Sequence, residues 1–285
     1  MSESVSAPFG ERVRATLRAH GPLCVGIDPH EALLQSWGLE DSAAGVREFG
    51  LRTVDAAAGR VGFIKPQVSF FERFGSAGFG ALEAVLAAAR SAGLVIIADA
   101  KRGDIGTTMD AYAAAWLTPG SPLEADAITV NPFLGVGTLQ STFARAEASG
   151  KGIFVLAATS NPEAAVVQRA QAGEDETVSA AIVSEVSTHN ARTASDGEWG
   201  SVGFVIGATV DWQGSGLVPF SPPAPILGPG FGAQGATPAD LRARYGAHAS
   251  MVIAAESRSI LSSGPDGLTA VIDTRAAQYQ EALNV

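Results

Sequence analysis

Eight short apolar runs, separated by longer stretches with helical spacing, most constrain what this chain can fold into. A strand that is buried on both faces reads as an uninterrupted apolar run. Strands that alternate with helices pair in parallel, because each helix carries the chain back to the edge where the next strand starts. Eight such units predict a (β/α)8 barrel. The predicted strands span residues 23–27, 61–64, 94–98, 127–130, 153–157, 202–206, 225–227 and 251–255.

An open doubly wound sheet is the competing architecture. It usually has fewer strands, and the Gly-x-Gly-x-x-Gly loop typical of its first strand does not follow residue 27. We therefore predict a single (β/α)8 barrel domain over residues 1–285. Two links depart from the regular unit: a helical insertion is expected near residues 162–200, and the helix of the Gly- and Pro-rich link 211–225 should be shortened or missing.

Bulk composition limits the partners and the compartment of this chain. With 46% hydrophobic and 17% charged residues, it fits a globular protein with a sizeable core. No apolar stretch reaches about 18 residues, so no membrane partner is expected. A net charge of −10 argues against a nucleic-acid partner. The single cysteine, Cys24, excludes an intramolecular disulfide, and the N-terminus is unlike a signal peptide, so we expect a cytoplasmic protein.

Charged residues follow the third apolar run abruptly. Asp99 and Lys101 are two residues apart and should therefore point to the same face of a strand, whereas Asp104 should lie beyond the strand. Burying charges is costly unless they pair, and buried pairs add little net stability. A fixed Asp–Lys pair at a strand end is therefore a candidate for chemistry rather than for stability.

Other polar residues follow the neighbouring predicted strands. Active sites of (β/α)8 barrels lie at the C-terminal strand ends, where all these side chains should converge. Ion pairs and loop caps are the structural alternative for any single residue, but they do not explain the whole group. The additional strand-end residues are Asp28, Lys65, Asn131, Thr159, Ser160 and Asn161.

A glycine-rich segment, 228–235, follows the seventh run, and Arg258 follows the eighth. Glycines let backbone amides approach a ligand closely, and a guanidinium binds phosphate through two hydrogen bonds. The loops after strands seven and eight are the usual phosphate site of such barrels. The next helix should start near Thr237, with Pro238 in its first turn. A glycine loop alone is weak evidence, but its position before Arg258 predicts a phosphate site.

Other chemistries find little support. His20, His30, His189 and His248 lack metal-ligand spacing, so no metal site is predicted. No Gly-x-Ser-x-Gly elbow and no Walker loop is present.

The spacing Asp99-x-Lys101-x-x-Asp104-Ile105-x-x-Thr108 resembles the signature of the orotidine 5′-phosphate decarboxylase family. The matching motifs run in order from residue 23 to about residue 261. The chain length and segments 131–132 and 160–162 are similar to the longer bacterial subgroup. The further matches are Asp28, Lys65 within 63–66, and the segments 207–209, 229–235 and 258–260.

This resemblance implies a cofactor-free, metal-free enzyme that converts orotidine 5′-monophosphate to uridine 5′-monophosphate and CO2. It implies a homodimer with shared active sites, in which Asp104, Ile105 and Thr108 reach the neighbouring subunit's site. Lys101 would protonate C6 of the pyrimidine, beside Asp99. The implied remaining roles are Lys65 and Asp104 in the charge network, Asp28 and Lys65 on the ribose, Ser160 on the pyrimidine, and Gln234, Gly235 and Arg258 on the phosphate.

Two departures and two rival functions accompany this resemblance. Ser257 stands where the family usually has glycine, and the link 211–225 is shortened. Mg²⁺-dependent keto-gulonate-phosphate decarboxylases share the Asp-x-Lys-x-x-Asp pattern, but they carry a carboxylate ligand where this chain has Lys65. A non-catalytic sensor of phosphorylated metabolites would use the same phosphate loop, yet it would leave the Asp99–Lys101–Asp104 group without a purpose.

Overall fold

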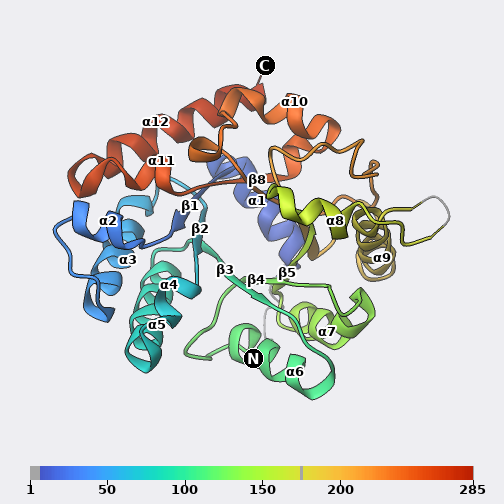
Figure 1. The fold of residues 1–285 in the computed structure, drawn as a ribbon, viewed down its shortest axis with the longest axis horizontal. Coiled ribbons are helices and arrows are strands. Elements are labelled where there is room, and N and C mark those ends of the chain that lie inside the picture. Colours follow the sequence, from blue (N-terminus) through green and yellow to red (C-terminus); the bar gives the residue numbers. More distant parts are fainter. Residues whose placement is uncertain (1–6, 174–175, 285) are drawn as a thin grey trace.

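Eight parallel strands close into a barrel in the order of the sequence (Figure 1). The structure is a computed structural model that describes residues 7–173 and 176–284. Each predicted strand is present, with bounds shifted by at most a few residues, so the (β/α)8 prediction is confirmed. The strands are β1 (Leu23–Ile27), β2 (Phe63–Pro66), β3 (Val95–Arg102), β4 (Ala127–Val130), β5 (Gly152–Ala158), β6 (Val202–Ile206), β7 (Ile226–Pro229) and β8 (Val252–Glu256).

Helices surround the barrel on all sides in Figure 1. No helix among residues 7–173 and 176–284 is long and apolar enough to cross a membrane. The α-helices are α1 (Phe9–His20), α2 (Glu31–Ser36), α3 (Ala43–Ala57), α4 (Ser69–Glu72), α5 (Gly75–Ser91), α6 (Gly106–Leu117), α7 (Gln140–Ala148), α8 (Ala165–Gln168), α9 (Val178–Thr193), α10 (Leu241–Tyr245), α11 (Arg258–Leu261) and α12 (Gly264–Asn284). The 3-10 turns are η1 (Val136–Leu139), η2 (Pro162–Ala164), η3 (Gly232–Gln234), η4 (Pro238–Asp240) and η5 (Gly246–Met251).

Two apolar layers hold these elements together. The larger layer lies between the strands and the outer helices, and the smaller one fills the barrel interior beneath α1. The ring of Phe9 on α1 packs edge-on against Phe154 of β5, with centroids 5.9 Å apart. A Cβ on Gly152 would lie 1.9 Å from the Phe9 ring, so only glycine permits this closure. Helix α1 thereby closes the end of the barrel at which the strands begin. The opposite end, at which the strands finish, remains open.

The two irregular links differ in their contents. The long link between β5 and β6 contains η2, α8 and α9. Among the described residues, the link between β6 and β7 contains no helix. Instead, Trp212 and Phe220 each stack on His248, with centroid distances of 5.4 and 4.3 Å. This aromatic stack packs the link against η5, where a regular unit would place a helix.

Strand β3 continues further than its apolar run. It extends through the charged residues to Arg102, and its pairing with β4 shifts register between Ala98 and Arg102. Lys101 accommodates this irregularity with a φ of +46°. Positive φ is uncommon for a residue with a side chain. The strand therefore delivers Asp99 and Lys101 into the barrel mouth through a local distortion.

Candidate active site

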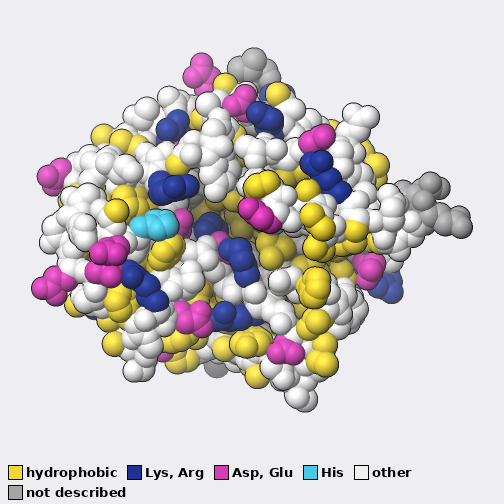
Figure 2. Space-filling model, in the orientation of Figure 1, with side chains coloured by type: hydrophobic (Ala, Val, Ile, Leu, Met, Phe, Trp, Pro, Cys, Tyr) yellow, Lys and Arg dark blue, Asp and Glu magenta, His cyan; other side chains and the backbone are white. Residues whose placement is uncertain are grey.

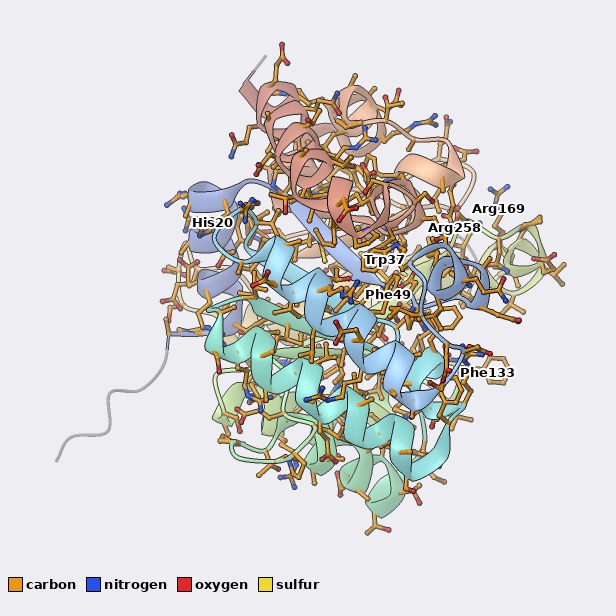
Figure 3. The ribbon with its side chains drawn as sticks, turned by 90° about the vertical axis from the view of Figure 1, so that its left-hand side faces the viewer. His20, Trp37, Phe49, Phe133, Arg169 and Arg258 are labelled. Atoms are coloured by element: carbon orange, nitrogen blue, oxygen red, sulfur yellow. The ribbon has the colours of Figure 1, made fainter. Side chains whose placement is uncertain are left out.

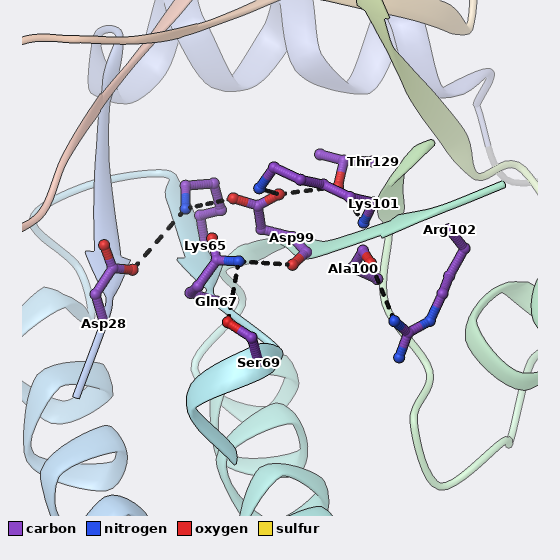
Figure 4. Close-up of polar contacts among 9 residues, drawn as sticks. All are labelled: Asp28, Lys65, Gln67, Ser69, Asp99, Ala100, Lys101, Arg102 and Thr129. Atoms are coloured by element: carbon purple, nitrogen blue, oxygen red, sulfur yellow. Dashed lines mark hydrogen bonds and ion pairs between the residues drawn. The ribbon is translucent and has the colours of Figure 1, made fainter. Parts of the chain in front are cut away.

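Lys65, Asp99 and Lys101 form a charge cluster at the open end of the barrel (Figure 4). The Nζ atom of Lys65 lies 3.1 Å from Oδ2 of Asp99, and Nζ of Lys101 lies 2.5 Å from Oδ1. Asp28 extends the cluster, with its Oδ1 4.0 Å from Nζ of Lys65. Lys65 lies on β2, Asp99 and Lys101 lie on the adjacent β3, and Asp28 directly follows β1. Parallel pairing thus brings together side chains that are far apart in the sequence.

A hydroxyl on β4 fixes the cluster from the other side. Oγ1 of Thr129 donates a hydrogen bond of 2.9 Å to Oδ1 of Asp99. The same Oγ1 accepts a 2.9 Å hydrogen bond from the backbone N–H of Lys101. Backbone strain of this kind persists only where surrounding contacts hold it in place. Thr129 provides such a contact, because its hydroxyl bonds both to the backbone of Lys101 and to the carboxylate of Asp99. The side chain of Lys101 contacts the same carboxylate.

Burial and charge act in opposite directions within the cluster. Burial alone raises the pKa of Asp99, but Lys65 and Lys101 outweigh burial and lower this pKa to about 2. Burial alone lowers the pKa of Lys65, but the charges of Asp99 and Asp28 raise it above its ordinary value. Both groups are therefore ionised near neutral pH. The side chain of Lys101 is 46% exposed, whereas that of Lys65 is only 8% exposed. Lys101 is thus the cluster's accessible cation.

A cavity of about 440 Å³ opens beside the cluster. Figure 2 shows the hollow at the centre of this face, with Lys and Arg side chains gathered in and around it. Asp28 and Lys65 line one part, and Gln234 and Arg258 line another. The cavity therefore joins the charge cluster to the predicted phosphate loops. In Figure 3, Arg258 lies on the side of the molecule opposite His20, the last residue of α1.

The predicted phosphate loop has the expected local geometry. Its residues Pro229, Gly230, Phe231, Ala233 and Gln234 line the cavity. Gly235 follows directly, with a φ of +104° that favours glycine. Thr237 and Asp240 form a capping box with Pro238 in the first turn, as the sequence predicts. Ser257 also lines the cavity, and its Oγ is buried without a hydrogen-bond partner.

Four predicted site residues lie outside the charge cluster, the lining of this cavity and the glycine-rich loop. Ser160 lines a smaller neighbouring cavity of about 140 Å³, together with Arg169 of the long link. Ile105 is 59% exposed and Thr108 is exposed as well. The carboxylate of Asp104 accepts a 2.8 Å hydrogen bond from the backbone N–H of Ile105. Within one chain the cluster therefore contains two lysines and two carboxylates, and the expected contribution of Asp104 to the neighbouring subunit's site stays a prediction.

Sequence reasoning missed three polar residues at this end of the barrel. Thr129 lies inside an apolar strand and carries no charge that would single it out. Gln67 follows Lys65 and Pro66 directly, and its side chain donates to the backbone carbonyl of Asp99 at 3.3 Å. Its position after a strand could have revealed it. Glu256 lines the cavity, and its charge at the end of an apolar strand could have revealed it.

The donor set of this site does not fit a divalent cation. Among the residues that the structure describes, no group of three His, Cys, Asp or Glu side chains could hold a metal ion. Lys65 lies between the carboxylates of Asp28 and Asp99. An ammonium in that position repels a second cation and already neutralises the carboxylate charge.

The structure is thus a (β/α)8-barrel protein with a cluster of paired charges at its open end. Residues 21–271 match the family described as "Orotidine 5'-phosphate decarboxylase / HUMPS family". The chain belongs to this family.

Individual relatives cover nearly the whole chain. The orotidine 5'-phosphate decarboxylase of Salinispora tropica is 48% identical over 258 residues, which cover 90% of this chain and 91% of that protein. The protein of the same name from Streptomyces coelicolor is 46% identical over 278 residues, which cover 97% and 98%. The crystal structure of a protein from Streptomyces avermitilis, described as a putative orotidine 5'-phosphate decarboxylase, superposes with a TM-score of 0.93, 42% identity and full coverage of both chains.

Proposed function

We propose that this chain decarboxylates orotidine 5′-monophosphate to uridine 5′-monophosphate and CO2, the last step of de novo pyrimidine biosynthesis. The observation that carries this function is the Lys65–Asp99–Lys101 cluster at the open mouth of a barrel of this family. The reaction leaves an electron pair at C6 of the pyrimidine, and a fixed cation beside that carbon stabilises the developing charge.

Lys101 is the proposed proton donor. When the bond between C6 and the carboxylate carbon breaks, CO2 leaves and the electron pair remains on C6, where a proton from Nζ of Lys101 forms the new C–H bond. Its 46% exposed side chain supports this role, because a proton donor must reach the substrate. Asp99 would lie against the substrate carboxylate, and the repulsion between them would disappear as CO2 forms.

The proposed binding roles fall on residues that line the two cavities and on Gly235, which directly follows Gln234. Asp28 and Lys65 would contact the ribose hydroxyls, while Gln234, Gly235 and Arg258 would bind the phosphate. Ser160 would contact the pyrimidine from its neighbouring cavity. The phosphate is remote from C6, so its binding energy can hold the substrate carboxylate beside Asp99 in spite of their repulsion.

We further propose a homodimer whose subunits complete each other's sites. Asp104 lies outside the cluster of its own chain, and the apolar side chains Ile105, Phe133 and Leu134 are 59%, 77% and 50% exposed. Exposed apolar side chains of this size favour burial against a partner. On this proposal Asp104, Ile105 and Thr108 enter the partner's site. Residues 1–285 would act as one barrel domain with the insertion near 162–200, in the cytoplasm.

Loss of orotidine 5′-monophosphate absorbance on addition of the purified chain tests the activity directly. We expect full turnover with EDTA present, because Lys65 occupies the position where a metal-dependent relative would carry a carboxylate. Activity that requires Mg²⁺ would favour the metal-dependent decarboxylases instead. Tight nucleotide binding without turnover would favour the sensor.

A further inference from the structure

Glu256 places a carboxylate in the wall of the proposed phosphate site. It is the last residue of β8, it is 1% exposed, and it lines the same cavity as Gln234 and Arg258. A buried carboxylate next to a phosphate dianion is unfavourable, because like charges repel strongly in a low dielectric. The proposed chemistry at C6 does not use this residue. Its presence therefore calls for another role.

Both oxygens of this carboxylate are already engaged. Oε1 accepts a 2.7 Å hydrogen bond from the hydroxyl of Tyr279, and Oε2 accepts a 2.6 Å hydrogen bond from the hydroxyl of Ser259. Nε of Arg275 lies 3.2 Å from Oε2 and balances the negative charge. Tyr279 and Arg275 lie on α12, and Ser259 lies on α11. One carboxylate thus connects the end of β8 to two helices.

The glycine loop after β7 rests on the same group. Gly232 has a φ of +69°, and a Cβ at this residue would lie 2.1 Å from Oγ of Ser259 and 2.7 Å from Oε2 of Glu256. Phe231, directly before it, packs edge-on against Tyr279 with ring centroids 5.5 Å apart. The loop therefore approaches the Glu256–Ser259 pair as closely as a residue without a side chain allows.

We propose that Glu256 is the positioning residue of the phosphate site. Through Ser259 it fixes the start of α11, where Arg258 lies, and through its contact with Gly232 it fixes the loop that carries Gln234. Arg275 cancels its charge, so the pair positions both loops without repelling the phosphate. This inference rests on the proposed function for the identity of the ligand, but it concerns how the phosphate-binding groups are held.

Product binding by the Glu256→Gln variant tests this role. The amide cannot accept hydrogen bonds at both former carboxylate oxygens, so we expect affinity for uridine 5′-monophosphate to fall by about 10- to 100-fold, the equivalent of one charge-assisted hydrogen bond. Affinity for uridine, which lacks the phosphate and can be followed by ligand-observed NMR, should not change. In turnover, KM should rise and kcat should change less than KM.

A matched control is Glu124→Gln. Glu124 also pairs with a buried cation, with its Oε1 2.8 Å from Nζ of Lys151, but it lies outside the cavity that Glu256 lines. This variant should bind both ligands as the wild type does. Should Glu256→Gln fail to fold, Tyr279→Phe and Ser259→Ala each remove one donor to the same carboxylate, and each should weaken the nucleotide but not the nucleoside.

Three results would overturn the proposal. Unchanged or tighter nucleotide binding by these variants would show that Glu256 does not position the site. An equal loss for nucleotide and nucleoside would indicate a general structural role. A wild-type protein that does not prefer the nucleotide would mean that the loops do not form a phosphate site. If the wild-type protein binds the nucleotide but does not decarboxylate orotidine 5′-monophosphate, these binding measurements can still be made. The proposed function and the proposed role of Glu256 can therefore fail independently.

Discussion

Lys101 contacts Asp99, two residues before it, from an unusual backbone conformation: its φ is +46°, and its Nζ lies 2.5 Å from Oδ1 of Asp99. Lys65 occupies the other oxygen of the same carboxylate at 3.1 Å. The two lysines differ in exposure, with 46% for Lys101 and 8% for Lys65. This difference separates an accessible cation from a buried one.

Replacing Lys101 with alanine should abolish turnover while preserving the fold. The proton donor and the cation beside C6 are both lost, so the decarboxylation rate should fall by at least ~10⁴-fold. Absorbance assays measure the rate, and circular dichroism with thermal unfolding checks the fold. Near-normal turnover by a folded Lys101→Ala protein would exclude Lys101 as the proton donor.

The two lysines should contribute very differently to stability. Lys65→Met leaves the buried Asp99 without its buried partner, so the free energy of unfolding should fall by about 3–5 kcal/mol. Lys101→Met removes a half-exposed cation and should cost about 1 kcal/mol or less. Urea unfolding of both variants at neutral pH measures the difference. Equal losses would contradict the assignment of Lys65 as the structural partner.

Acid should reduce the contribution of Asp99 to the free energy of unfolding within a defined pH range. Its pKa is about 2 in the folded chain and 3.8 in the reference state. Since the folded pKa is the lower one, the stabilisation is complete above about pH 4 and is lost as the pH falls toward 2. The stability difference between wild type and Asp99→Asn should therefore shrink by about 2 kcal/mol over this window. Urea unfolding at pH 4.5 and 2.5 tests this, and a constant difference would refute it.

Thr129→Val should impair positioning of Lys101 more than substrate binding. The variant keeps the side-chain shape but removes the hydroxyl that bonds to Asp99 and to the backbone of Lys101. Loss of one hydrogen bond to a charged group costs about 1.5–3 kcal/mol, so kcat should fall by about 10- to 100-fold. KM should change little. A rise in KM at unchanged kcat would place the effect on binding instead.

Mixed dimers should reveal whether Asp104 acts across the interface. Lys101→Ala and Asp104→Ala chains should each be nearly inactive alone. If Asp104 serves the partner's site, a mixed dimer regains one site with both native residues, and random mixing restores about a quarter of wild-type activity. Mixtures that stay inactive after confirmed subunit exchange would show that Asp104 acts within its own chain.

Much of this protein can be predicted from its sequence. The alternation of apolar runs and helical segments determines the barrel, because burial on both faces of a parallel strand leaves a local signature. Charges directly after an apolar run are equally visible, and they identify Asp28, Lys65, Asp99 and Lys101. The missing helix at 211–225 is also local, since Gly and Pro disfavour helix formation.

Only the tertiary structure decided which groups meet. Thr129 contacts Asp99 across 30 residues of sequence, and Tyr279 contacts Glu256 across 23. Neither Thr129 nor Tyr279 carries a charge or a motif that marks it in the sequence. The carboxylate of Asp104 accepts a hydrogen bond from the next residue of its own loop, and the neighbouring subunit that it is expected to reach is a matter of assembly. Periodicity and composition record whether a side chain is buried, whereas its partner depends on how distant strands and helices pack.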